Sequence, residues 1–210
     1  MNNWQPQGTV YGTLLNFQRE WDLWAPRMAQ DPHKGAPKAP VLYVKTANTF
    51  NPSQALRLQD GVTEVDIGAS LGLVMGPSGQ AQSLVLLNDW SVPHTSYYRP
   101  AIKFRCRDGF LACGAQLVPS KAVNLAQIKI TVQLNGDTVQ TVDLSTLVRT
   151  AAQLLDDVGE FMALRPGDVL MLGTDCLDNG LRPRARAGDT VRLEAAGFAP
   201  LVQTVLGGAA

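Results

Sequence analysis

Histidine and cysteine are scarce in this chain of 210 residues, which has two histidines and three cysteines. The histidines, His33 and His94, are far apart in the sequence. The cysteines, Cys106, Cys113 and Cys176, lack any spacing typical of metal ligands. Both features argue against a zinc site, which proteins build mainly from clustered histidines and cysteines. We expect the three thiols to be reduced, as is usual in the cytoplasm.

The chain also has no excess of charge, because 18 basic side chains balance 18 acidic ones. This balance argues against nucleic acid or an acidic membrane surface as a partner. No apolar run approaches the roughly 20 residues that span a bilayer, and Met1–Gly8 is polar, unlike a signal peptide. No glycine-rich loop joins a strand to a helix, so nucleotide binding has no support. We expect a cytoplasmic globular protein with one domain over residues 1–210.

Alternating hydrophobic residues and turn signals predict short strands along most of the chain. The predicted strands are 8–16, 41–45, 62–75 (as one or two strands), 83–87, 128–134, 138–142, 169–172 and 190–195, and the predicted helices are 17–28 and 145–161. Asn135-Gly136 is typical of a tight hairpin turn, and Asp143 or Ser145 could cap the second helix. Many short strands with few helices indicate an α+β, β-rich roll and not a doubly wound sheet.

The stretch 97–109 is unusually charged for a segment between two apolar strands. Its charged residues are Arg99, Lys103, Arg105, Arg107 and Asp108. Guanidinium groups bind carboxylates in a bidentate way, so this stretch could form an anion-binding site. It could equally be a solvated loop with a proline turn. Because a buried arginine without a partner is costly, we predict that at least one of Arg99, Arg105 and Arg107 contacts a carboxylate.

Three motifs in and before this stretch carry a family resemblance. They are Asn88-Asp89-Trp90-Ser91, Tyr98-Arg99-Pro100 and Arg105-Cys106-Arg107-Asp108-Gly109. Over Gly8 to Val205 the chain resembles the fumarylacetoacetate hydrolase superfamily, and in particular the amino-terminal half or subunit of its isomerase/decarboxylases of 4-hydroxyphenylacetate degradation. The resemblance implies a mixed β-sandwich roll that usually dimerises. It also implies small unsaturated keto-dicarboxylate or tricarboxylate substrates, decarboxylated or isomerised through a metal-held enolate.

In that family, Mg²⁺ or Mn²⁺ is held by a Glu-x-Glu pair on one strand and by the aspartate of an Asn-Asp pair. The resemblance places Asp89 at the aspartate position, but Gly68 and Ser70 at the two glutamate positions. Asp66 and Glu64 lie on the same face of the strand and could serve a displaced ion. We predict that the isolated chain binds Mg²⁺ or Mn²⁺ at millimolar levels or not at all.

Other site residues also follow from the resemblance. Glu20 aligns with a general acid/base histidine, and a carboxylate could still transfer protons. Arg105 aligns with a lysine, and it could hold a substrate carboxylate but not deliver a proton. The implied substrate-binding residues are Lys45, Tyr98, Arg99 and Thr174. Plainer interpretations stay open: a solvated helix residue for Glu20, a solvated strand end for Lys45, a turn at Thr174 and an interface patch around Tyr98.

Three functions remain compatible with these residues. The chain could be a subunit of the isomerase/decarboxylase, or a scaffold subunit that pairs with a metal-competent relative. It could also be a module that binds a carboxylate through Arg99, Arg105 and Arg107. The missing carboxylates at positions 68 and 70 favour the scaffold. We expect a homodimer or a companion subunit of the same fold, with little turnover by this chain alone.

Overall fold

The computed structural model describes residues 4–31, 35–94 and 102–208. The larger sheet has the order β2 (Val41–Lys45), β1 (Val10–Leu14), β12 (Val169–Met171), β6 (Ala69–Met75), β7 (Ala81–Asp89), β8 (Leu111–Cys113) and β3 (Phe50–Asn51), with β9 (Val118–Pro119) paired to β7. The second sheet has the order β11 (Asp137–Asp143), β10 (Lys129–Leu134), β14 (Thr190–Ala195), β15 (Leu201–Leu206) and β4 (Ala55–Arg57), and β13 (Arg184–Arg186) pairs with β5 (Glu64–Asp66). The α-helices are α1 (Gln18–Met28), α2 (Ile102–Arg105) and α3 (Ala151–Gly159), and 3₁₀ turns lie at 47–49, 120–122, 125–127 and 144–146.

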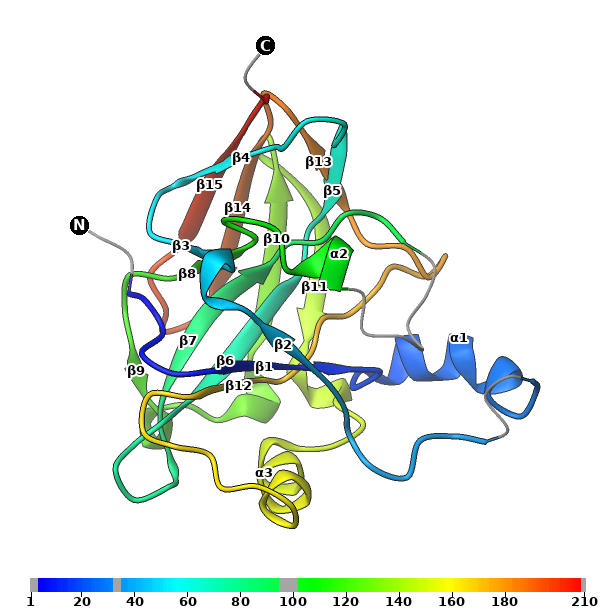
Figure 1. The fold of residues 1–210 in the computed structure, drawn as a ribbon, viewed down its shortest axis with the longest axis vertical. Coiled ribbons are helices and arrows are strands. Elements are labelled where there is room, and N and C mark those ends of the chain that lie inside the picture. Colours follow the sequence, from blue (N-terminus) through cyan, green and yellow to red (C-terminus); the bar gives the residue numbers. More distant parts are fainter. Residues whose placement is uncertain (1–3, 32–34, 95–101, 209–210) are drawn as a thin grey trace.

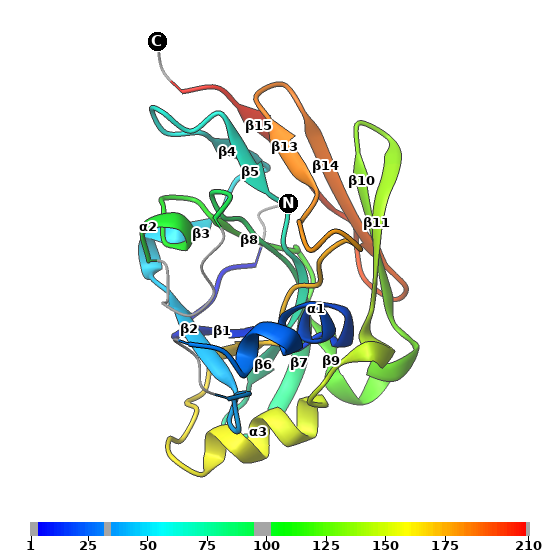
Figure 2. The ribbon, with the colours of Figure 1, turned by 90° about the vertical axis from the view of Figure 1, so that its right-hand side faces the viewer.

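Two curled sheets therefore dominate a strand-rich structure with few helices (Figure 1). In Figure 2 the β10–β11 hairpin and β14 stand on one side of the molecule, β1 and β2 lie on the other, and α3 lies at the end away from the carboxyl terminus. The prediction of a β-rich α+β fold is confirmed. No helix in the described ranges is long and apolar enough to cross a bilayer.

Strand β6 is at the centre of the molecule, and all of its residues are buried. Leu71 and Leu73 belong to the same buried cluster as Ile130 of β10, which fills the space between the two sheets. Val74, on the opposite face, belongs to a second buried cluster, against which Trp21 of α1 packs. Because both faces of β6 are covered, its sequence does not alternate between apolar and polar residues, and Ser70 is its one polar side chain.

The local sequence signals located several elements well. Strands β2 and β14 have the predicted bounds, and α1 begins one residue after the predicted start of the first helix. The predicted hairpin turn is confirmed as well, since Asn135 (φ 53°) and Gly136 (φ 96°) both adopt the left-handed conformation that a tight hairpin turn requires.

The predicted helix 145–161 is wrong in its first third, because α3 begins at Ala151. Asp143 caps a 3₁₀ turn at 144–146 instead. Val148, whose backbone N–H donates to the backbone carbonyl of Asn16, then lies in a bend and not in a helix. The cap of α3 is Thr150, whose side chain and that of Gln153 form a reciprocal capping box. Neither predicted cap, Asp143 nor Ser145, is therefore the cap of this helix.

Candidate functional site

Asp89, the last residue of β7, is the centre of a buried charge cluster. Its carboxylate has no side-chain exposure and lies 2.8 Å from Lys45 Nζ and 2.9 Å from Arg105 Nη1. The hydroxyl of Tyr43 donates to the same carboxylate. Three segments distant in sequence thus meet here, namely β2, the end of β7 and the end of α2.

The ammonium group of Lys45 is saturated by protein atoms. Besides its ion pair with Asp89, it donates to the backbone carbonyls of Trp90, Arg105 and Phe110. The residue is 1% exposed, so its interpretation as a solvated strand end is wrong. Lys45 holds together the strand ends that surround Asp89.

The charges of this cluster shift one another's proton affinities. Burial alone would raise the pKa of Asp89, but the cations of Lys45 and Arg105 outweigh it and hold that pKa below its ordinary value. Burial, and then the nearby Asp89 carboxylate, raise the pKa of Tyr43 well above its ordinary value. Asp89 is therefore the anion of the cluster, and Tyr43 is a neutral donor.

Arg105 has one amino group on Asp89, and its guanidinium carbon lies 4.8 Å from the centre of the Tyr43 ring. This contact confirms that at least one of the three arginines meets a carboxylate. The other amino group, Nη2, is buried and has no hydrogen-bond partner. Arg107 is bound elsewhere, to Gln59 Oε1 at 2.8 Å. The predicted residues Tyr98 and Arg99 lie outside the described ranges.

A second buried ion pair joins Glu20 of α1 to Arg182, just before β13. Arg182 Nη2 donates to Glu20 Oε1 at 2.8 Å, and its Nε donates to Thr174 Oγ1 at 3.0 Å. Glu20 is 2% exposed and also accepts the backbone N–H of Leu15, so its interpretation as a solvated helix residue is wrong. Sequence reasoning missed Arg182, although Arg182, Arg184 and Arg186 alternate in a way that could have marked it.

The residues present do not fit a divalent metal. A Cβ at Gly68 would lie 2.2 Å from the backbone oxygen of Asp89, so this backbone has no space for a side chain there. Ser70 is buried, and its hydroxyl donates to the carbonyl of Leu71. Among the described residues there is no group of three or more His, Cys, Asp or Glu side chains that could hold an ion.

The two neighbouring acidic residues are engaged elsewhere. Arg184 binds Asp66 through Nε at 3.1 Å and Glu64 through Nη1 at 2.6 Å. An ion displaced toward these two residues would therefore have to compete with a guanidinium group. No step of the chemistry can be assigned to a metal on this set of donors.

We expect calorimetric titration with Mn²⁺ or Mg²⁺ to show no binding in the micromolar range. The physical reason is that Asp89, the one carboxylate that the family resemblance places at a metal-ligand position, is already neutralised by Lys45 and Arg105. Micromolar binding would contradict this expectation. In that case Asp66→Ala and Glu64→Ala, titrated separately, would identify the recruited ligand.

Two pockets flank the buried charges. One, of about 240 Å³, is lined by Leu42, Tyr43, Val44, Thr46, Ile102, Arg105 and Cys106. The other, of about 140 Å³, is lined by Asp66, Pro93, His94, Gly180, Leu181, Arg182 and Arg184. Sequence reasoning did not place His94 at a site, and burial lowers the pKa of its imidazole. The Asp89 cluster therefore has a mainly apolar pocket on its Arg105 side, and the Glu20–Arg182 ion pair has a pocket of mixed polarity beside it.

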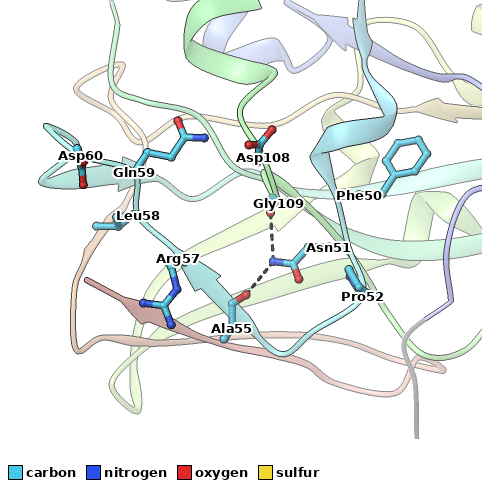
Figure 3. A pocket seen from close by; sticks show the side chains of 10 residues that line it. All are labelled: Phe50, Asn51, Pro52, Ala55, Arg57, Leu58, Gln59, Asp60, Asp108 and Gly109. Carbon is cyan, nitrogen blue, oxygen red and sulfur yellow. Dashed lines mark hydrogen bonds between the residues drawn. The ribbon is translucent and has the colours of Figure 1, made fainter. Parts of the chain in front are cut away.

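A larger pocket, of about 520 Å³, lies apart from these charges, between β3, β4 and the turn after α2 (Figure 3). The side-chain amide of Asn51 spans this region, donating to Ala55 at 2.8 Å and to Gly109 at 3.2 Å (Figure 3). None of the residues of the Asp89 cluster lines it. Asn51 thus links β3, at the edge of the larger sheet, to β4, at the edge of the second sheet, so this region is a junction between the two sheets.

Comparisons with known proteins agree with this fold. The family profile described as "Fumarylacetoacetate (FAA) hydrolase C-terminal" matches residues 9–206. The 4-hydroxyphenylacetate degradation bifunctional isomerase/decarboxylase of Escherichia coli is 34% identical over 211 aligned positions, which cover 95% of this chain and 47% of that protein. The chain thus spans about half the length of the first curated relatives it matches.

Solved structures show the same architecture. The 5-carboxymethyl-2-hydroxymuconate delta-isomerase of Mycobacterium smegmatis has a TM-score of 0.77 at 20% identity, with 100% of this chain and 83% of that chain covered. Fumarylpyruvate hydrolase of Pseudomonas aeruginosa, solved in complex with Mn²⁺ and pyruvate, has a TM-score of 0.77 at 19% identity, with 96% and 91% covered. These likenesses confirm the predicted roll of curled sheets.

Proposed function

The chain belongs to the fumarylacetoacetate hydrolase family, and from that premise we propose that it is the metal-free half of a keto-acid isomerase/decarboxylase of 4-hydroxyphenylacetate degradation. The observation that carries this proposal is the neutralisation of Asp89 by Lys45 and Arg105, in a centre that lacks the other two metal ligands. Residues 1–210 would form one cytoplasmic domain that assembles with a metal-competent companion of the same fold, or with a second copy.

The substrates would be small unsaturated keto-dicarboxylates or tricarboxylates. The two reactions would be those of 2-hydroxyhepta-2,4-diene-1,7-dioate isomerase and of 5-carboxymethyl-2-oxo-hex-3-ene-1,7-dioate decarboxylase. The half-length match to the Escherichia coli relative supports a companion, because that relative has room for a second domain. A divalent metal, where the complete assembly uses one, would be held by the companion.

The residues of this chain would have supporting roles in such an assembly. Glu20 has both carboxylate oxygens engaged, one by Arg182 and one by the backbone of Leu15, so it would transfer a proton only after Arg182 moved away. Thr174 is held by the same guanidinium group. Lys45 and Arg105 would provide positive charge for a substrate carboxylate, with Tyr98 and Arg99 as further proposed contacts.

We expect little keto-acid turnover by this chain alone and a clear gain when a companion is added. The companion to use is a chain of the same fold with an intact Glu-x-Glu pair, taken from the same genome. Decarboxylation and isomerisation are measured with each chain alone and with the mixture. If this chain alone reached the rate of the mixture, the absence of glutamates at Gly68 and Ser70 would not prevent catalysis. If the companion alone matched the mixture, the supporting role would be wrong.

A second candidate function is supported by one specific observation. The free amino group of Arg105 is buried beside a pocket, as it would be in a module that binds a carboxylate without turning it over. The two functions are compatible, since a supporting half can also hold part of a substrate.

A further inference from the structure

One core position of β15 carries a polar side chain. The buried residues of this strand are Leu201, Gln203 and Val205, and Gln203 is 1% exposed. Leu201 and Val205 belong to the apolar cluster between the two sheets. A buried amide costs free energy unless it is hydrogen-bonded, and an apolar side chain of similar length would pack there without that cost. A glutamine is therefore useful at this position only through the groups that it binds.

The two ends of the Gln203 amide are used differently. Its oxygen, Oε1, accepts from the indole N–H of Trp90 at 2.8 Å and from the side-chain amide of Asn88 at 3.3 Å. An indole N–H can only donate, so the oxygen and not the nitrogen must face Trp90. The nitrogen, Nε2, is buried and has no hydrogen-bond partner among the described residues, which is itself a cost. What this residue contributes is therefore an acceptor shared by two donors.

The two donors are the immediate neighbours of Asp89 in the chain. Asn88 and Trp90 are both completely buried, and both reach from the end of β7 toward Gln203 in the second sheet. Successive side chains of an extended chain point to opposite faces. Asp89, which lies between the two, accordingly points the other way, toward the two cations of its cluster.

We propose that Gln203 is a positioning residue for Asp89. From the second sheet it holds the residues on either side of Asp89, and so it fixes the face of the chain on which the carboxylate meets its cations. A slip of one residue would exchange the two faces and move the carboxylate away from these cations. That the Asp89 cluster supports a substrate rests on the proposed function. The positioning itself does not, because it requires neither a substrate nor a companion chain.

The test is hydrogen exchange of the full chain, followed by NMR, with the variant Gln203→Met, which stays apolar and unbranched but lacks the acceptor oxygen. The backbone N–H groups of Gly68, Asp89 and Trp90 each form a hydrogen bond at or beside the end of β7. The amides of β10, in the second sheet, report on global unfolding. Protection of the first group should fall at least about tenfold more than protection of β10, because buried donors lose their acceptor. A side chain that only fills the core would lower both groups alike.

Gln140→Met is the matched control. Gln140 of β11 is 5% exposed and also has an unpartnered Nε2, but the donors beside Asp89 bond to Gln203 and not to it. This variant should change the ratio between the two groups of amides by less than about twofold. Thermal melting verifies that the variants fold. If Gln203→Met does not fold, Gln203→Asn replaces it, since the shorter amide withdraws the oxygen by one methylene and should give the same local loss.

Three outcomes would overturn the proposal. They are an equal loss of protection at the end of β7 and in β10, unchanged protection of Gly68, Asp89 and Trp90, and the same local loss in the Gln140 variant. None of these bears on whether the chain increases a companion's rate. A failure of the companion assay would in turn leave the exchange result intact, so the two proposals can fail separately.

Discussion

Replacing Lys45 by methionine should lower the free energy of unfolding by about 3–5 kcal/mol, the range observed when one partner of a buried ion pair is removed. The variant leaves Asp89 buried with one cation instead of two. It also removes the donor for the backbone carbonyls of Trp90 and Phe110. The measurement is chemical denaturation of the isolated chain at neutral pH.

Lys129→Met is the matched control for this change. Its ammonium lies 2.9 Å from Asp143, close to the 2.8 Å between Lys45 and Asp89, but 64% of the Lys129 side chain is exposed to solvent. Exposed ion pairs contribute about 1 kcal/mol or less, so this variant should be nearly as stable as the unmodified chain. A Lys45 variant no less stable than the Lys129 variant would show that the Asp89 cluster does not stabilise the fold.

Gly68→Ala should lower the free energy of unfolding by about 3 kcal/mol, at the upper end of the usual range for overpacking in a filled core. The new Cβ would meet the Asp89 backbone oxygen at 2.2 Å and Thr174 Cγ2 at 3.1 Å. The backbone cannot move aside easily, because Gly68 donates to the side chain of Asn88 and accepts the N–H of Asp89. Denaturation curves for the variant and the unmodified chain measure the difference.

Gly159→Ala, at the end of α3, is the control for this second change. A Cβ there meets no atom within 4 Å, and alanine favours helix more than glycine does, so stability should rise by up to about 1 kcal/mol.

The crowding at Gly68 also has a consequence for metal binding. Glutamates introduced at positions 68 and 70 should unfold the chain before they create a metal site. A stable double variant that binds Mn²⁺ would contradict the crowding argument.

The sequence alone determined the class of fold and the limits on the chemistry. Strand β14 and the Asn135-Gly136 turn could be located because alternation and turn conformation depend on neighbouring residues. The motif around Asp89 indicated the family, and the same resemblance predicts that Gly68 and Ser70 stand where that family has two glutamate ligands. These conclusions need residue identity and spacing, and both can be read along the chain.

The tertiary structure alone decided what each charged residue contacts. Glu20 and Arg182 are 162 positions apart, and no local pattern indicates that they meet in a buried ion pair. Lys45 and Asp89 come from strands at different places in the same sheet, so their pairing depends on how that sheet curls. Burial and charge pairing are sums over long-range contacts, which local patterns do not encode. For the same reason the second helix begins later than predicted. The backbone N–H of Val148 donates to the backbone carbonyl of Asn16, which is 132 positions away in the sequence.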